Sequence, residues 1–157
     1  MITQLCCFTG HRPEKLSSSE REIRRALARE VAQAVADGYR GFITGMARGV
    51  DLWAAQTVLA LREDRPDIGL ICALPYEGFE RRWSWDWQEA YRQVLAEADH
   101  IQICSPQFSY GAFQARNRWM VDRSGRLIAV YNGAAGGTAN TVAYAQQRGC
   151  EIRWIPG

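Results

Sequence analysis

The sequence predicts an α/β protein: a Rossmann-like three-layer domain with a mainly parallel sheet of about six strands. Short apolar runs alternate with longer helical patterns along all 157 residues, and no linker, repeat or low-complexity tract interrupts them. The runs lack the polar–apolar alternation of a half-exposed strand, which favours strands buried on both faces of a parallel sheet. We therefore expect one domain that spans residues 1–157.

The elements follow in order along the chain. The strands are expected at Leu5–Thr9, Gly41–Thr44, Ile68–Leu74, His100–Cys104, Leu127–Tyr131 and Glu151–Ile155. The first helix begins in the serine cluster at 17–19, where Ser19 and Glu22 predict a capping box. Apolar residues then recur on one helical face as far as Gly38: Ile23, Leu27, Val31 and Val35. The later helices are expected at Val50–Arg62, Ser84–Glu97, Ala112–Asp122 and Thr138–Gln147.

Composition narrows the function classes. The apolar fraction of 47% and the charged fraction of 23% are those of an ordinary globular protein. A net charge of +2 is too small to indicate nucleic acid or a membrane surface on electrostatics alone. We see no secretory signal and no apolar stretch near the roughly 20 residues of a membrane span, so we expect a cytoplasmic protein. The five cysteines form no C-x-x-C pair, which favours reduced thiols, and we expect no metal or cofactor site.

In parallel α/β sheets, ligands bind beyond the carboxyl ends of the strands, so the turns there are the places to search. The turn after the first strand gathers hydrogen-bonding groups beside a glycine that permits close backbone approach. The candidate ligand-binding residues in it are Thr9, Gly10, His11 and Arg12. An arginine there can contact a phosphate through two hydrogen bonds. The alternative is an ordinary polar turn that ends at Pro13.

The turn after the second strand carries Thr44, then Gly45 and Gly49 directly before a helix. Two glycines at a helix start allow backbone N–H groups to meet an anion, although the spacing is neither that of a Walker A loop nor G-x-G-x-x-G. Asp51 falls in the first turn of this helix. Its carboxylate either interacts with the helix dipole or accepts hydrogen bonds from ribose hydroxyls, and position alone does not decide between these roles.

The turn after the fifth strand is the strongest phosphate-site candidate. No side chain larger than a methyl group stands between residues 133 and 137, and hydroxyl side chains follow at the helix start. The candidate ligand-binding residues here are Asn132, Gly133, Gly136, Gly137, Thr138 and Thr141.

Two further segments supply candidates. Arg116 and Asn117 lie on the helix after the fourth strand, and Arg118 beside them is also consistent with a solvated basic face. In the aromatic segment 76–91, most rings are expected in the core. Phe79 and Trp85 lie off the helical stripe, so they are candidates for stacking on a base or for a subunit contact. An apolar patch there would favour a homo-oligomer.

These motifs resemble a known family. The segments Thr9-Gly10-His11-Arg12-Pro13 and Thr44-Gly45-Met46-Ala47-Arg48-Gly49-Val50-Asp51 are similar to those of YpsA-like proteins. That family belongs to the SLOG superfamily, together with the LOG phosphoribohydrolases and the Smf/DprA proteins. The resemblance covers nearly the whole chain and implies a Rossmann-like fold and a nucleotide-related ligand.

The resemblance also allows a comparison with the hydrolases of the superfamily. LOG enzymes carry R-K-x-x-M and P-G-G-x-G-T-x-x-E. Arg116 and Met120 match the first pattern, with Asn117 in place of the lysine. In the second pattern Gly137 and Thr138 match, but Thr141 stands where the glutamate belongs. Hydrolysis of an N-glycosidic bond needs a carboxylate, which Thr141 lacks.

Three functions are therefore considered. The first is binding of a nucleotide or nucleotide-derived phosphate ligand at the glycine-rich turns, as in a sensor. The second is cleavage of a nucleoside monophosphate by a phosphoribohydrolase-like enzyme, with Arg116 and Asp51 as the catalytic pair. The third is DprA-like binding of single-stranded DNA along a basic strip, which the small net charge disfavours. The strip would consist of Arg81, Arg82, Arg116 and Arg118.

Overall fold

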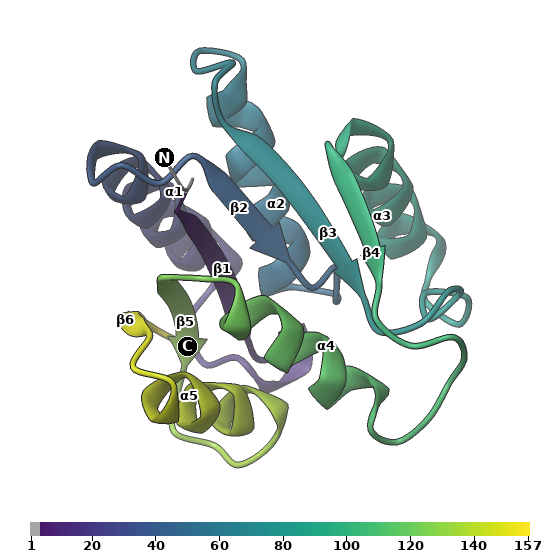
Figure 1. Cartoon of the computed structure of the whole chain (residues 1–157). Coiled ribbons are helices and arrows are strands. Elements are labelled where there is room, and N and C mark those ends of the chain that lie inside the picture. The colour runs from purple at the N-terminus through teal and green to yellow at the C-terminus, as the bar shows by residue number, and fades with distance from the viewer. Residues whose placement is uncertain (1–3) are drawn as a thin grey trace.

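The computed structural model describes residues 4–157. Six strands form one parallel sheet in the order β4-β3-β2-β1-β5-β6 (Figure 1), which confirms the expected Rossmann-like architecture. The strands are β1 (Leu5–Gly10), β2 (Gly41–Thr44), β3 (Gly69–Leu74), β4 (His100–Ile103), β5 (Arg126–Tyr131) and β6 (Glu151–Pro156). The helices are α1 (Glu20–Ala36), α2 (Val50–Arg62), α3 (Trp85–Glu97), α4 (Ala112–Asp122) and α5 (Gly137–Gln147), with a short 3₁₀ helix, η1, at Pro13–Lys15.

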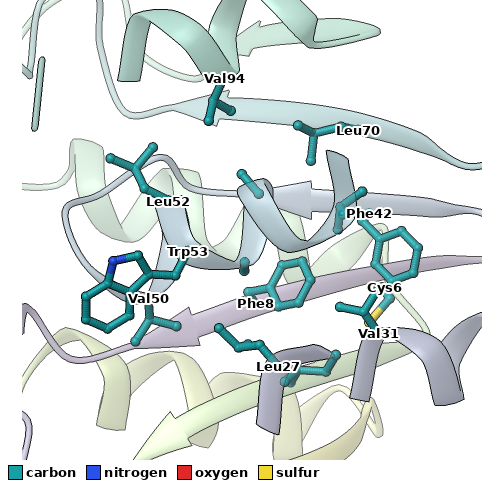
Figure 2. Packing of buried hydrophobic residues seen from close by; sticks show 14 of the residues in the cluster. Cys6, Phe8, Leu27, Val31, Phe42, Val50, Leu52, Trp53, Leu70 and Val94 are labelled. Atoms are coloured by element: carbon teal, nitrogen blue, oxygen red, sulfur yellow. The ribbon is translucent and has the colours of Figure 1, made fainter. Parts of the chain in front are cut away.

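Helices cover both faces of the sheet and bury a separate apolar cluster on each. The larger cluster joins α1, α2 and α3 to one face, where Phe8 and Phe42 stack with ring centroids 6.1 Å apart (Figure 2). The smaller cluster joins α4 and α5 to the other face through Met120 and Val142. The central strands are therefore buried on both faces, which is why their sequences are continuous apolar runs. The five cysteines are free thiols.

Helix α1 forms as its sequence predicts. The Ser19 hydroxyl accepts a hydrogen bond from the Glu22 backbone N–H at 3.2 Å, and it donates to the Glu22 carboxylate at 3.0 Å. The four stripe residues are buried against the sheet: Ile23, Leu27, Val31 and Val35. Their burial, rather than helix propensity alone, supplies most of the stability of this helix.

The edge strands differ from expectation. The sequence predicts strands buried on both faces, but β4 and β6 each have only one neighbour in the sheet. Ile101 and Ile103 of β4 are 42% and 44% exposed, and Trp154 of β6 is 52% exposed. An apolar run indicates a strand but not its place in the sheet, because strand order depends on contacts far apart in the sequence.

Within residues 4–157, no helix is long and apolar enough to cross a membrane.

The winding direction of the sheet reverses at β1. Strands β1 to β4 add successively on one side, and the chain then returns so that β5 pairs with the other side of β1. The helices that follow β1 and β5 consequently lie on opposite faces of the sheet, and a crevice opens between them at the carboxyl ends of these strands. The turns that the sequence singled out end at this crevice.

A close approach at Gly10 holds the first turn against α2. A Cβ atom added to Gly10 would lie 2.5 Å from Cβ of Val50, which is buried. We predict that Gly10→Ala lowers the free energy of unfolding by about 2 kcal/mol, as overpacking of a core does. Gly137→Ala is the matched control because nothing lies within 4 Å of its added Cβ. Urea denaturation measures both, and equal midpoints for the two variants would contradict the packing described at Gly10.

Candidate functional site

A cleft of about 380 Å³ lies at the carboxyl end of the sheet. Segments that follow each of the strands β1 to β5 contribute to its lining, so the chain reversal at β1 brings together residues that are distant in sequence. The cleft is lined by many of the residues predicted from the sequence: Thr9, Gly10, His11, Arg12, Asp51, Arg116, Asn117, Gly136, Gly137 and Thr138.

The other predicted ligand-binding residues do not line the cleft: Thr44, Gly45, Gly49, Asn132, Gly133 and Thr141. The Thr44 hydroxyl is buried and donates to the Asp51 carbonyl at 2.7 Å, so it holds the turn that enters α2. The Thr141 hydroxyl donates to the Gly137 carbonyl one helical turn earlier, at 2.8 Å. These two hydroxyls are therefore engaged by the backbone.

The side chains of Arg116 and Asp51 both approach Gly45 closely. A Cβ atom added to Gly45 would lie 2.9 Å from both Nη1 of Arg116 and Oδ2 of Asp51. Arg116 is 5% exposed, donates from Nη1 to the Gly45 carbonyl, and donates from Nε to Oδ1 of Asn117 at 2.8 Å. Helix α4 is thereby tied to the turn after β2, across the floor of the cleft.

Asp51 as a whole residue is 8% exposed. Its carboxylate accepts a hydrogen bond from the Ala47 backbone N–H at 3.2 Å. Burial raises the pKa of Asp51, and the nearby Arg116 guanidinium partly offsets this shift. Burial likewise lowers the pKa of Arg116, with Asp51 acting in the opposite direction. Desolvation thus favours the neutral form of each group, while their mutual attraction favours the charged forms.

The turn between Gly45 and α2 contains an unusual backbone conformation. Met46 has φ 65° and is completely buried. Its N–H donates to the Thr44 hydroxyl at 3.3 Å, which compensates part of the cost of this left-handed conformation. Left-handed residues other than glycine cluster at functional sites, because only strong local contacts maintain them.

His11 anchors the glycine-rich turn that precedes α5. It is 5% exposed, stacks on Tyr131, and accepts through Nε2 a hydrogen bond from the Asn132 backbone N–H at 3.2 Å. The Asn132 side chain extends this anchor, since it donates to the Lys15 carbonyl at 2.9 Å and accepts from the Ala134 N–H at 3.0 Å. His11 and Asn132 therefore position the turn by contacts within the protein.

The N-terminus of α5 opens directly into the cleft. Gly136 precedes the helix with φ 138°, a conformation that favours glycine, and no side chain caps this end. Nothing lies within 4 Å of a Cβ added to Gly136 or Gly137. The first backbone N–H groups of a helix have no partner inside it, so an uncapped start that lines a cleft is suited to an anion.

Basic side chains line the same cleft as this helix start. Arg12, Lys15, Arg48 and Arg116 all line the cleft, whereas Asp51 is the sole acidic residue in its lining. Arg48 is paired with Glu14 at 3.2 Å, but within the part of the chain that the structure describes no ion pair engages Arg12 or Lys15. The charge balance favours an anionic ligand. Across residues 4–157, no three His, Cys, Asp or Glu side chains gather closely enough to hold a metal ion.

Comparison with known proteins identifies the family. The family model YpsA, described as the YspA SLOG family, matches residues 6–153. The chain belongs to the YspA SLOG family. The YspA SLOG assignment confirms the resemblance inferred from the turn motifs.

Curated relatives of this YspA SLOG chain include UPF0398 proteins of Bacillus. The proteins of Bacillus thuringiensis (strain Al Hakam) and Bacillus cereus (strain AH187) are each 29% identical to it, over 95% of this chain and 85% of their own length. The region matched by the family model, residues 6–153, contains every residue that lines the cleft, since these run from Phe8 to Thr138.

Solved structures of DprA proteins share the fold. DprA from Streptococcus pneumoniae has a TM-score of 0.67 at 16% identity, covering 99% of this chain but 51% of the pneumococcal one. DprA from Helicobacter pylori, whose structure concerns binding of single-stranded DNA, has a TM-score of 0.69 at 22% identity. The match covers 98% of this chain and 66% of the Helicobacter pylori chain. The chain thus spans about half to two thirds of these proteins, and at such identities the likeness establishes the fold alone.

Sequence reasoning did not select Lys15, Trp83 or Phe113 as site residues, yet all three line the cleft. Lys15 follows a proline that the sequence marks as the end of a turn, so the short helix η1 was not anticipated. Trp83 belongs to the aromatic segment whose rings were mostly expected in the core; it precedes α3, packs half-buried against the larger apolar cluster, and also lines the cleft.

The anchor at His11 predicts a pH dependence of stability. Burial lowers the pKa of His11 from 6.5, so the neutral, hydrogen-bond-accepting ring is favoured in the folded state. The unfolded protein therefore binds a proton first as the pH falls, and the contribution of His11, complete above about pH 6.5, is lost as the pH drops toward the lowered folded value. We predict a decrease in unfolding free energy between pH 7.5 and 5.5 that His11→Phe reduces.

The control for this prediction is the second histidine of the chain. His100 is exposed at the sheet edge, so His100→Gln should leave the pH dependence as in the wild-type protein. Urea denaturation at several pH values measures all three proteins. A slope that is unchanged in His11→Phe would show that the imidazole remains an equally good proton acceptor in the folded and unfolded states.

Proposed function

We propose that the cleft binds a nucleotide or a nucleotide-derived phosphate ligand. The observation that carries the proposal is the convergence of an open helix N-terminus with unpaired basic side chains. The start of α5 at Gly137 lines the same cleft as Arg12 and Lys15, which come from the opposite side of the crevice. A phosphate at this position would interact with backbone N–H groups, the positive end of the helix dipole and two cations.

The floor of the cleft suits a sugar. Asp51 accepts one backbone hydrogen bond through Oδ2, and the carboxylate has further acceptor capacity toward a ribose hydroxyl. Thr9 is buried near the end of β1 and lines the cleft beside Gly10. A nucleotide would therefore place its phosphate at α5 and its ribose above Asp51.

One observation favours a second candidate, phosphoribohydrolase-like cleavage of a nucleoside monophosphate. Burial raises the pKa of Asp51 inside the cleft, and a carboxyl group of raised pKa is suited to proton donation. In that reaction water would add to the anomeric carbon, the N-glycosidic bond would break, and the departing base would take up a proton. Thr141 supplies no part of this chemistry, because it has no carboxylate, does not line the cleft, and donates its hydroxyl to the Gly137 carbonyl. Release of free base distinguishes this candidate from simple binding.

Binding of single-stranded DNA, described for the Helicobacter pylori protein, receives less support in this chain. The basic strip expected from the sequence is interrupted, since Arg116 is buried in the cleft floor while Arg81, Arg82 and Arg118 are exposed. Arg118 lies over the Tyr144 ring at 5.2 Å, on the outer side of α4 and α5. An open strip for a nucleic-acid backbone does not form from these four residues.

The binding proposal is tested by isothermal titration with AMP, GMP, CMP and UMP. We predict a selective response, and we predict that Arg12→Ala weakens the binding by about tenfold, the effect of removing one charge-assisted hydrogen bond. Arg12 is exposed and unpaired within the described chain, so the variant should fold normally. The matched control is Arg29→Ala, which removes an exposed cation from α1 at a position outside the cleft lining.

Equal loss of affinity in Arg12→Ala and Arg29→Ala would show that binding responds to net charge rather than to the cleft. Absence of binding by every nucleotide tested would overturn the proposal. Analysis of the titrated samples for free base separates the two candidate functions in the same experiment.

A further inference from the structure

We propose that Phe79, Trp83 and Phe113 form a base subsite, so that the ligand is a nucleotide with an intact aromatic base rather than a bare sugar phosphate. This inference rests on the proposed function and specifies the chemical class of its ligand. The three rings line the same cleft as the start of α5, and each is only half-buried. They come from the segment between β3 and α3 and from the first turns of α4.

The rings form a continuous wall. Phe79 meets Trp83 edge to face, with centroids 5.1 Å apart and planes at 79°. It meets Phe113 in the same manner, at 6.3 Å and 71°. Edge-to-face pairs of this kind are attractive beyond the area they bury, and all three rings line the cleft.

Other aromatic residues hold the wall in place from behind. Tyr91 is 4% exposed. Its ring centroid lies 5.8 Å from that of Phe79 and 5.7 Å from that of Trp83. The ring centroid of Tyr76 lies 6.2 Å from that of Phe79 and 5.9 Å from that of Phe113. The wall is therefore ordered before a ligand arrives, which reduces the entropy lost on binding.

The position of the wall matches the other end of a nucleotide. Phe79 and Trp83 follow β3, Phe113 follows β4, and the phosphate site follows β5, which is three strand positions from β3 in the sheet. With about 4.8 Å between neighbouring strands, β3 and β5 are roughly 14 Å apart, and residues from both ends line one cleft. The Arg116 guanidinium lies 5.8 Å from the Phe113 ring centre, so the wall adjoins the floor where the ribose is placed.

The chemistry of the wall identifies what it contacts. The cations of the cleft are Arg12, Lys15, Arg48 and Arg116, whereas the wall itself is uncharged. Aromatic faces stack on the planar faces of bases, and every base offers such a face. Trp85, the other ring considered for stacking, is 68% exposed and does not line the cleft.

The test compares nucleotides with ribose 5-phosphate by isothermal titration. In the wild-type protein, at least one of AMP, GMP, CMP and UMP should bind about tenfold or more tightly than ribose 5-phosphate, as expected for one stacked base. Phe113→Leu should remove most of this difference and leave the affinity for ribose 5-phosphate unchanged. Trp83→Phe should retain the difference, whereas Trp83→Leu should reduce it, because only the former keeps a ring in the wall.

Tyr110→Ser is the control, since Tyr110 is 96% exposed and outside the cleft lining. It should leave both affinities unchanged, and thermal unfolding without ligand should confirm that every variant is folded. If ribose 5-phosphate binds as tightly as the best nucleotide, or if Phe113→Leu weakens both ligands equally, the base subsite is wrong while the phosphate site stands. If neither ligand class binds, the proposed function fails and the subsite fails with it.

Discussion

The reversal of strand order at β1 is the constraint on which the cleft depends. Because β2 and β5 pair with opposite sides of β1, the chain leaves the carboxyl ends of these strands toward opposite faces of the sheet. The polar turn after β1 lies at the centre of the resulting crevice, and His11 connects it to the turn before α5. Gly10 lets this turn approach α2 closely. The glycine-rich helix start thus faces Arg12 and Lys15 as a consequence of topology, although these residues are more than a hundred positions apart in the sequence.

The buried pair of Arg116 and Asp51 adds a second level of organisation. Two ionisable groups in the cleft floor are costly to desolvate, and their arrangement around Gly45 compensates part of this cost by hydrogen bonds to the backbone. Arg116 also joins α4 to the turn after β2, so this guanidinium positions the helix that carries Phe113. The same residues that give the cleft its charge therefore support its walls. The cleft has a cationic end, a polar floor and an aromatic wall. In the proposed binding mode these three parts are complementary to the phosphate, the ribose and the base of a nucleotide.

Much of the fold could be predicted from the sequence, because its signals are local. Apolar runs marked the strands, and the Ser19–Glu22 capping pair marked the start of α1. Because ligands of parallel α/β sheets bind beyond the carboxyl ends of the strands, the turns that line the cleft could be chosen from the sequence. Side-chain direction was not predictable, since it depends on tertiary contacts. The Thr141 hydroxyl turns back to its own helix, the Asn132 side chain bonds to the Lys15 carbonyl, and Trp83 lines the cleft as well as packing against the core. Whether the predicted residues bind a ligand stays a prediction.

The most direct test of the central claim is amide chemical-shift mapping of the ¹⁵N-labelled protein during titration with AMP. The account predicts that the largest changes occur at Gly136, Gly137 and Thr138, where the open helix start would receive the phosphate, and at Arg12 across the cleft. Changes confined to the amides of Arg81, Arg82 and Arg118, or no changes with AMP, GMP, CMP or UMP at millimolar concentration, would contradict the assignment of this cleft as the nucleotide site.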